Sequence, residues 1–271
     1  MNRPTYVVLG ASGRLGRHLL PLLPDPERVV ALSRRHHDSA RTTWLVTDLS
    51  EGPCSVSPLV DRLRDAESVT LVDLVLDRRS VATMRRSLAT STKFTIAVRH
   101  CLHAARVPAR IVVASSTAVL APIGLRTPYG IAKRRQAGVY GREVGVDLVL
   151  LPQLGGLTPY EAAAAHLAGV MAMPSPADRR LWLVPTPPPT DGPHIGLGAA
   201  AQLSLLAWTT RRSDPAAARH ASHVRLDQLP PRLRARLDHH TAPPFLRRRF
   251  ERDLGLAPAR LLTSEDICEA P

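Results

Sequence analysis

The chain has 271 residues, and its 36 lysines and arginines against 23 aspartates and glutamates give a formal net charge of +13. Apolar residues make up 44% and charged residues 22% of the sequence, which suits one large globular domain or two small ones and excludes a disordered chain. No apolar run comes near the roughly 20 residues that span a bilayer, and the start lacks a signal-peptide pattern, so we expect a cytoplasmic protein with no membrane partner.

Short aliphatic runs alternate with amphipathic segments of helical length through the first 155 residues. This alternation is typical of βαβ units and predicts an α/β fold with a doubly wound parallel sheet. From residue 157 onward the alternation stops and prolines become frequent. The predicted strands are 6–9, 29–32, 43–46, 69–75, 110–114 and 147–151. The predicted helices are 15–23, 57–64, 81–89, 93–105 and 129–144.

A turn with three glycines, GASGRLG, lies between the first predicted strand and the first predicted helix. Glycine lets the backbone approach a phosphate closely, and a helix N-terminus offers free N–H groups. The spacing is GxxGxxG and differs from the GxGxxG of the dehydrogenase fingerprint, and the alternative is an ordinary strand-to-helix turn. The predicted cofactor-binding residues of this turn are Gly10, Ser12, Gly13, Arg14, Leu15 and Gly16.

The end of the second predicted strand carries no carboxylate, which is the group that accepts hydrogen bonds from the adenosine ribose of NAD. Instead Ser33, Arg34 and Arg35 follow, and one hydroxyl with two guanidiniums can bind a 2′-phosphate by charge-assisted hydrogen bonds. The pattern therefore favours NADP over NAD. The alternative is that the two arginines belong only to a basic surface.

Hydroxyl residues and a tyrosine–lysine pair indicate proton exchange with a carbonyl or alcohol oxygen. Ser116 lies in a run of three hydroxyl residues after the fifth predicted strand, 13 residues before Tyr129. Tyr129 and Lys133 are four apart, so on a helix they share a face, and an ammonium beside a phenol lowers the phenol's pKa. The chain has only one other lysine, Lys93, which argues against a chance placement.

Together these motifs resemble those of the short-chain dehydrogenases/reductases, in particular the extended or atypical branch related to the NAD-dependent epimerase/dehydratase family, over about residues 5–157. PYGIAK resembles the catalytic motif, which implies that Tyr129 donates and accepts the proton and that Lys133 modifies its pKa and binds the nicotinamide ribose. HAARVPARIVVASSTAV resembles the segment that delivers the active-site hydroxyl, which implies Ser116, with Ser115 and Thr117 as substitutes.

The same resemblance implies further cofactor contacts. TDLS resembles the segment in which Asp48 and Leu49 meet the adenine, and LVLLPQLGGL resembles the segment in which Pro152 lies near the nicotinamide. Two departures stand out. Asp73 stands at the end of the fourth strand, where relatives often have small residues, and it either contacts the ribose or substrate or caps the strand. Phe94 stands where many relatives have the asparagine that binds a proton-relay water.

We expect residues 1–156 to form an NADP-binding, Rossmann-like domain and residues 157–271 to form mostly a small substrate-binding region packed on it. Segments 153–160, 182–187 and 194–197 are apolar, and we expect them to line the pocket of a small organic substrate. The predicted function is NADPH-dependent reduction of a carbonyl, or oxidation of the matching alcohol, in a biosynthetic reaction. The alternatives are an epimerase, a redox-neutral dehydratase or cyclase, and an NADP-sensing binding protein without catalysis.

The expected partners are NADP(H) and a small molecule. Arginines are scattered along the chain, which favours a solvated basic surface over nucleic-acid binding. The histidines and the three cysteines show no metal-ligand spacing, so we expect no metal site. A homodimer through the helices 93–105 and 129–144 is an expectation from the resemblance alone.

Overall fold

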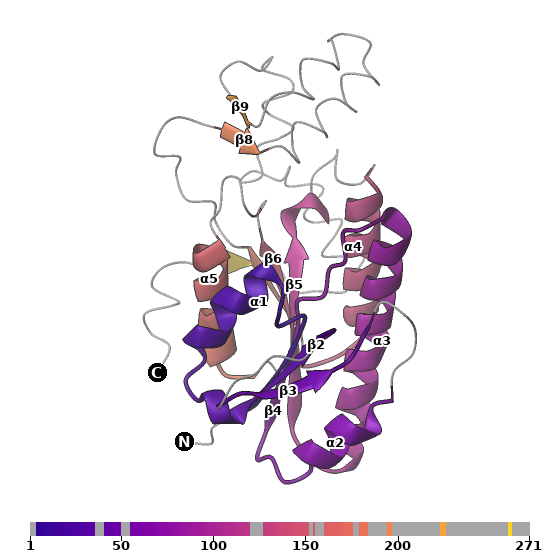
Figure 1. Ribbon diagram of the computed structural model, residues 1–271, viewed down its shortest axis with the longest axis vertical. Helices are drawn as coiled ribbons and strands as arrows, with labels where there is room; N and C mark the ends of the chain where they lie inside the picture. Colours follow the sequence, from indigo (N-terminus) through magenta and orange to yellow (C-terminus); the bar gives the residue numbers. More distant parts are fainter. Residues whose placement is uncertain are drawn as a thin grey trace.

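The computed structural model describes residues 4–35, 41–49, 55–119, 127–151, 154, 160–175, 179–183, 194–196, 223–225 and 260–261. One sheet of eight parallel strands forms the centre of the molecule, in the order β10-β7-β6-β5-β4-β1-β2-β3 (Figure 1). The doubly wound parallel sheet predicted from the sequence is therefore confirmed. Its strands are β1 (Thr5–Leu9), β2 (Val29–Ser33), β3 (Thr43–Val46), β4 (Val69–Asp73), β5 (Ala109–Ser116), β6 (Val146–Leu151), β7 (Arg179–Leu183) and β10 (Arg260–Leu261). The remaining strands, β8 (His194–Gly196) and β9 (His223–Arg225), form an antiparallel pair.

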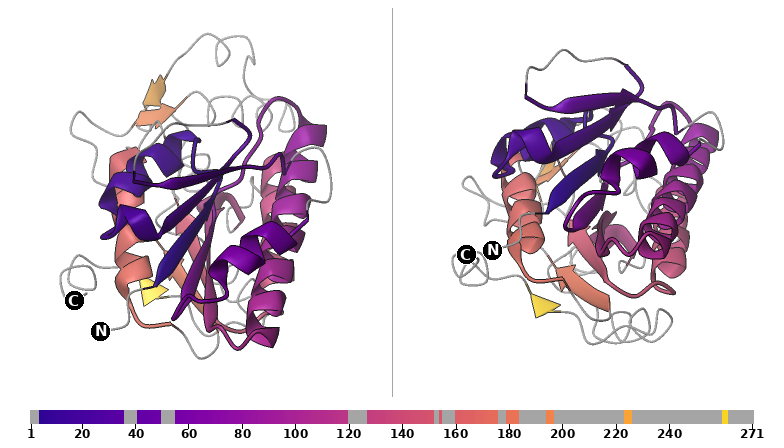
Figure 2. Two further views of the ribbon diagram at one scale, coloured as in Figure 1. Left: turned by 60° about the horizontal axis from the view of Figure 1, so that its bottom comes forward. Right: turned by 90° about the horizontal axis from the view of Figure 1, so that it is seen from below.

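Helices cover both faces of the sheet (Figure 2). Two helices pack against each other on one face, and three cover the other. The first group is α1 (Arg14–Leu19) and α5 (Tyr160–Ala172), and the second is α2 (Ser57–Leu63), α3 (Val81–Ala104) and α4 (Pro128–Tyr140). Burial on both faces explains why the central strands are nearly continuous aliphatic runs. In the part of the chain that the structure describes, no helix is long and apolar enough to cross a membrane.

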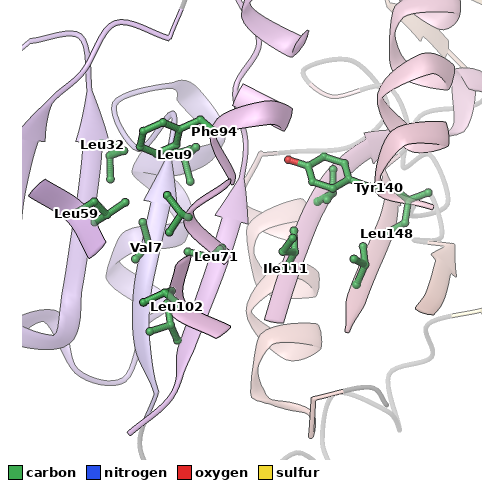
Figure 3. Packing of buried hydrophobic residues seen from close by; sticks show 14 of the residues in the cluster. Val7, Leu9, Leu32, Leu59, Leu71, Phe94, Leu102, Ile111, Tyr140 and Leu148 are labelled. Carbon is green, nitrogen blue, oxygen red and sulfur yellow. The ribbon is translucent and has the colours of Figure 1, made fainter. Parts of the chain in front are cut away.

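The larger core lies between the sheet and the second group of helices (Figure 3). Aliphatic side chains such as Val7, Leu71 and Ile111 cover this face of the sheet, and Leu102 packs on them from α3. Tyr140 of α4 is fully buried beside them with its polar hydroxyl. A buried phenol hydroxyl needs a hydrogen-bond partner, so this face of the core must also contain polar groups.

Helix α3 is continuous where the sequence predicted two helices, 81–89 and 93–105. The predicted gap falls on hydroxyl residues, which favour turns because their side chains compete for backbone hydrogen bonds. In the structure the Thr92 hydroxyl donates to the Leu88 carbonyl at 2.6 Å, and the Ser91 hydroxyl shares its hydrogen between that carbonyl at 3.2 Å and the Asp73 carboxylate at 3.1 Å, so both have partners without a break in the helix. The predicted interruption between residues 89 and 93 was therefore wrong.

The alternation of strand and helix also continues beyond residue 157, where the sequence predicted that it stops. Helix α5 is rich in alanine and packs on the sheet, and β7 then pairs in parallel with β6. Trp182 of β7, which was predicted to line the substrate pocket, is 1% exposed and belongs to the core. The division of the chain at residue 156 stays a prediction.

A buried ionic cluster joins β5, β6 and β7 near their amino ends. The Asp147 carboxylate is fully buried and accepts hydrogen bonds from the Arg180 guanidinium at 2.7 and 3.1 Å and from the Trp182 indole N–H at 2.8 Å. Arg110 lies 3.7 Å from the same carboxylate and also donates to two backbone carbonyls at the end of α5. Because each charge has partners, the cluster offsets the cost of removing its charges from water.

We expect Asp147→Ala to lower the free energy of unfolding by about 3–5 kcal/mol, because it leaves the buried Arg110 without its counter-charge. Urea unfolding followed by circular dichroism measures this loss. The matched control is Asp61→Ala, which removes an exposed carboxylate that pairs with Arg64 at 3.3 Å and should cost about 1 kcal/mol or less. Equal losses in the two variants would contradict the proposed role of the cluster.

Candidate functional site

The predicted site residues gather at one edge of the sheet because parallel strands all end there. Strand order reverses between β1 and β4, and in open α/β sheets ligands bind beside the carboxyl ends of the strands at such a point. The glycine turn follows β1, Ser33 ends β2, and Ser116 ends β5. The topology therefore places the three sequence signals along one edge.

The glycine turn is shaped by close contacts that leave no room for side chains. Gly10 has a φ of +78°, in the left-handed region, and a Cβ there would lie 3.1 Å from the backbone of Leu74. A Cβ on Gly16 would lie 2.3 Å from the Ala11 carbonyl oxygen, which the structure cannot accommodate without moving the backbone. Gly13 is exposed at the start of α1, and the first turn of that helix contains no acidic residue. This arrangement is compatible with an anion at the turn.

Ser33 links the end of β2 to the glycine turn. Its hydroxyl donates to the Ser12 hydroxyl at 2.9 Å and accepts from the backbone N–H of Arg35 at 3.2 Å. The two sequence signals, the glycine turn and the Ser-Arg-Arg segment, therefore meet through one hydrogen bond between side chains. Arg14 and Arg35 are exposed, and Leu15 is buried against the sheet.

Arg34 pairs with a carboxylate from a neighbouring loop. Its guanidinium lies 3.1 Å from the Asp77 carboxylate, which also binds Arg79 at 2.7 Å. Hydrogen bonds from Arg79 lower the pKa of Asp77, and the charge of Arg34 lowers it further. About half of the Arg34 side chain is exposed. Arg34 therefore lies at the expected edge with part of its surface open to a ligand and with its charge shared with Asp77.

Ser116 ends β5 and Tyr129 lies in the first turn of α4, and Ser116 Oγ accepts a hydrogen bond from the Ala118 backbone N–H at 3.2 Å. Burial raises the pKa of the half-buried Tyr129, while the Ser116 hydroxyl and the guanidinium of Arg78 lower it. The Arg78 guanidinium carbon lies 5.9 Å from the centre of the Tyr129 ring. Arg78 was not predicted as a site residue, because in a chain this rich in arginine nothing in the sequence distinguishes it.

Lys133 shares α4 with Tyr129, but its ammonium bonds elsewhere. The side chain is 4% exposed, and Nζ donates to the Ala114 carbonyl at 2.9 Å and to Gln136 Oε1 at 3.0 Å. Burial lowers the pKa of Lys133 to about 8, although the charge of Asp73 opposes this shift. The sequence did not predict Gln136, because a glutamine on a helix carries no distinctive signal.

Asp73 is buried beneath this site and is not a simple strand cap. One carboxylate oxygen accepts from the Val75 backbone N–H at 3.0 Å. The other accepts from Ser91 Oγ at 3.1 Å, Gln136 Nε2 at 3.1 Å and Tyr140 Oη at 2.7 Å. Burial raises the pKa of Asp73, and the charge of Lys133 and these hydrogen bonds oppose the shift. A carboxylate that ends an aliphatic strand was the one available sequence signal for this network.

The remaining predicted residues have varied positions. Leu49 is 5% exposed and packs in the core beside β2, and Asp48 directly precedes it. Ser115 is buried, and its hydroxyl has no hydrogen-bond partner among the residues that the structure describes. Thr117 begins a short 3₁₀ turn, and Pro152 lies outside the described residues. Within the described ranges no three His, Cys, Asp or Glu side chains gather as metal ligands.

The sequence matches no protein-family model and no curated protein. Solved structures do share the fold. Serine dehydrogenase from Escherichia coli superposes with a TM-score of 0.50 at 16% identity, covering 65% of this chain and 95% of that chain. UDP-N-acetylglucosamine 4-epimerase from Bacillus cereus superposes with a TM-score of 0.46 at 12% identity, covering 66% of this chain and 75% of that chain. A glucuronic acid dehydrogenase from Chromohalobacter salexigens superposes with a TM-score of 0.47 at 15% identity, covering 66% of this chain and 76% of that chain.

Similarity at this level of identity establishes a fold and not an activity. The fold shared with these structures is Rossmann-like, a parallel sheet with helices on both faces. The family-like motifs GASGRLG and PYGIAK lie at the places where this fold presents ligand-binding loops and the helix α4.

We expect Gly16→Ala to lower the free energy of unfolding by about 1–3 kcal/mol, because the new methyl group would overlap the Ala11 backbone. Thermal or urea unfolding measures the change. Gly13→Ala is the matched control in the same turn, since its Cβ would meet only the Gly10 carbonyl oxygen, at 3.1 Å. A Gly16→Ala variant as stable as Gly13→Ala would show that the close contact is not a constraint.

Proposed function

We propose that the protein is an NADPH-dependent reductase, or a dehydrogenase in the reverse direction, for a carbonyl or alcohol group on a small organic substrate. The observation that carries the proposal is the placement of Ser116, at the carboxyl end of β5, and Tyr129, in the first turn of α4, at the same sheet edge as the glycine turn, with α4 tied to the end of β5 by the hydrogen bond from Lys133 to the Ala114 carbonyl. A phenol and a serine hydroxyl at one edge of the sheet are the two groups that this chemistry needs to hydrogen-bond a single substrate oxygen. A strand-to-helix glycine turn alone would support only nucleotide binding.

The residues at this edge fit a dinucleotide. The crowded glycine turn at Gly10 and Gly16 supports a pyrophosphate site, because backbone can approach a phosphate there without a side chain between them. The exposed guanidiniums of Arg34 and Arg35 support a 2′-phosphate contact, which is why we propose NADP rather than NAD. Leu49 and Asp48 are proposed for the adenine, Lys133 for the nicotinamide ribose and Pro152 for the nicotinamide.

A nicotinamide cofactor held by these residues would supply the hydride that the carbonyl carbon takes up. Tyr129 donates its phenolic proton to the carbonyl oxygen, and Ser116 holds that oxygen by a hydrogen bond. Burial keeps Tyr129 protonated at neutral pH because it raises the phenol's pKa, so the side chain is in its proton-donating form. Arg78 stabilises the phenolate that remains after proton transfer, since its positive charge lies beside the ring.

We expect the double variant Arg34→Ala, Arg35→Ala to weaken NADPH binding by about tenfold to a hundredfold and to leave NADH binding nearly unchanged, because two charge-assisted hydrogen bonds to the 2′-phosphate are lost. Fluorescence or calorimetric titration with each nucleotide measures the affinities. Arg85→Ala, Arg86→Ala is the matched control, since it removes two exposed arginines of α3 and the same charge. Failure of the wild-type protein to bind either nucleotide would overturn the redox proposal.

With a carbonyl substrate found by screening NADPH consumption, Tyr129→Phe should reduce the rate by about a hundredfold or more and leave NADPH affinity unchanged, because only the proton donor is lost. Arg78→Ala should reduce the rate less, through a higher pKa of Tyr129. Product formation with no net consumption of NADPH would instead indicate an epimerase or another redox-neutral reaction. An undiminished rate in Tyr129→Phe would exclude this residue as the proton donor.

A further inference from the structure

A network of buried polar side chains lies directly under the proposed site and connects three elements of the fold. Asp73 ends β4, Ser91 belongs to α3, and Lys133, Gln136 and Tyr140 belong to α4. All five residues are at most 4% exposed. Such a network costs free energy to bury unless its members satisfy one another, so its hydrogen bonds must be specific.

The hydrogen bonds around Asp73 favour its ionised form. Four donors converge on its two oxygens, from the Val75 backbone and from the side chains of Ser91, Gln136 and Tyr140. The Val75 and Gln136 N–H groups can only donate, one to each carboxylate oxygen, and an ionised carboxylate can also accept from both hydroxyls. Burial opposes this ionised form, and the charge of Lys133 and the hydrogen bonds favour it, so a charged Asp73 depends on a compensating charge nearby.

The compensating charge is the Lys133 ammonium, and Gln136 joins the two groups. The Gln136 amide accepts from Lys133 Nζ at 3.0 Å through Oε1 and donates to Asp73 at 3.1 Å through Nε2. Only this orientation of the amide satisfies both neighbours. The reverse orientation would place the amide NH₂ against the Lys133 ammonium and the amide oxygen against the Asp73 carboxylate. The amide therefore transmits the position of Asp73 to Lys133.

We propose that Asp73, acting through Gln136, is the positioning residue that holds Lys133 in its charged form with one N–H left for a ligand. The inference rests on the proposed function, in which that ligand is the nicotinamide ribose. Two of the three ammonium hydrogens are used by Ala114 and Gln136 among the described residues, so one remains. Phe94 of the same helix α3 lies in the core and contributes no polar group, so among the described residues the Lys133 ammonium donates to the Ala114 carbonyl of β5 and to Gln136 of this network.

The groups that face Lys133 determine how it titrates. Asp73 of β4 favours the charged ammonium, and Arg78 of the following loop disfavours it. Helix α3 contributes the uncharged Ser91 and α4 the phenol of Tyr140, both directed at Asp73. Removing the charge of Asp73 should therefore shift the equilibrium toward neutral Lys133.

The test is an NMR titration of protein labelled with ¹³C at the lysine side chains, because the chain contains only Lys133 and the exposed Lys93. Lys133→Arg assigns the two signals. In the wild-type protein we expect the Lys133 signal to titrate with a midpoint of about 8. Asp73→Asn should lower that midpoint by about one pH unit or more, since an adjacent opposite charge is lost.

Gln136→Met should lower the midpoint by a smaller amount, because it removes the bridging amide at similar volume while Asp73 keeps its charge. The matched control is Asp61→Asn, which removes one exposed carboxylate of α2 and should leave the Lys133 signal unchanged. The positioning role would be overturned if the Lys133 midpoint in Gln136→Met equalled that of the wild-type protein. The same holds if a folded Asp73→Asn protein shows the wild-type midpoint.

The cofactor is tested separately in the same samples. Addition of NADP⁺ should shift the Lys133 signal in the wild-type protein, and Gln136→Met should weaken NADP⁺ binding by about tenfold through the displaced ammonium. If NADP⁺ leaves the wild-type signal unchanged, the cofactor proposal fails. If the titration responds to Asp73→Asn but NADP⁺ affinity is unaffected by Gln136→Met, the network tunes the charge of Lys133 and does not position it for a ligand, which contradicts the inference.

Discussion

The parallel pairing of β1 with β2 on one side and with β4 on the other is the constraint on which the site depends. In this register Leu9 lies beside both Leu32 and Asp73, so the chain leaves all three strands at one level. The segments that follow are then forced together. The hydrogen bond between Ser12 and Ser33 and the close approach of Gly10 to Leu74 are direct results of this register.

Two buried aspartates have different roles at the two ends of the sheet. Asp147 lies near the amino ends of the strands and is compensated directly by arginines, which makes it a stabilising cluster. Asp73 lies at the carboxyl end and is compensated by Lys133 through the Gln136 amide. In the Asp147 cluster the arginine N–H groups donate directly to the carboxylate. In the Asp73 network the Gln136 amide stands between carboxylate and ammonium, which leaves one Lys133 N–H able to bind a further acceptor. This difference matches the position of each aspartate, since ligands bind at the carboxyl ends of parallel strands.

The sheet, the glycine turn and the helix that carries Tyr129 and Lys133 could be predicted from the sequence, because aliphatic periodicity and glycine placement act over a few residues. The predicted break in α3 was wrong because local hydroxyl preferences are overridden once those hydroxyls bond the helix's own carbonyls. The extension of the sheet by α5 and β7 was missed because the alanine-rich helix has little amphipathic pattern. Trp182 could not be assigned to the core, since its partner Asp147 lies 35 residues away.

By itself the sequence determined the class of fold and the order of the candidate groups along the chain, because both follow from local patterns of side-chain size and polarity. Only the tertiary structure decided which groups meet. It paired Arg34 with Asp77, set Arg78 beside Tyr129 and directed the Lys133 ammonium to Gln136 and Ala114. These partners come from different strands and loops, and their contacts depend on the register of the sheet and on the cost of burying an uncompensated charge. Neither quantity can be read from the spacing of residues in the chain.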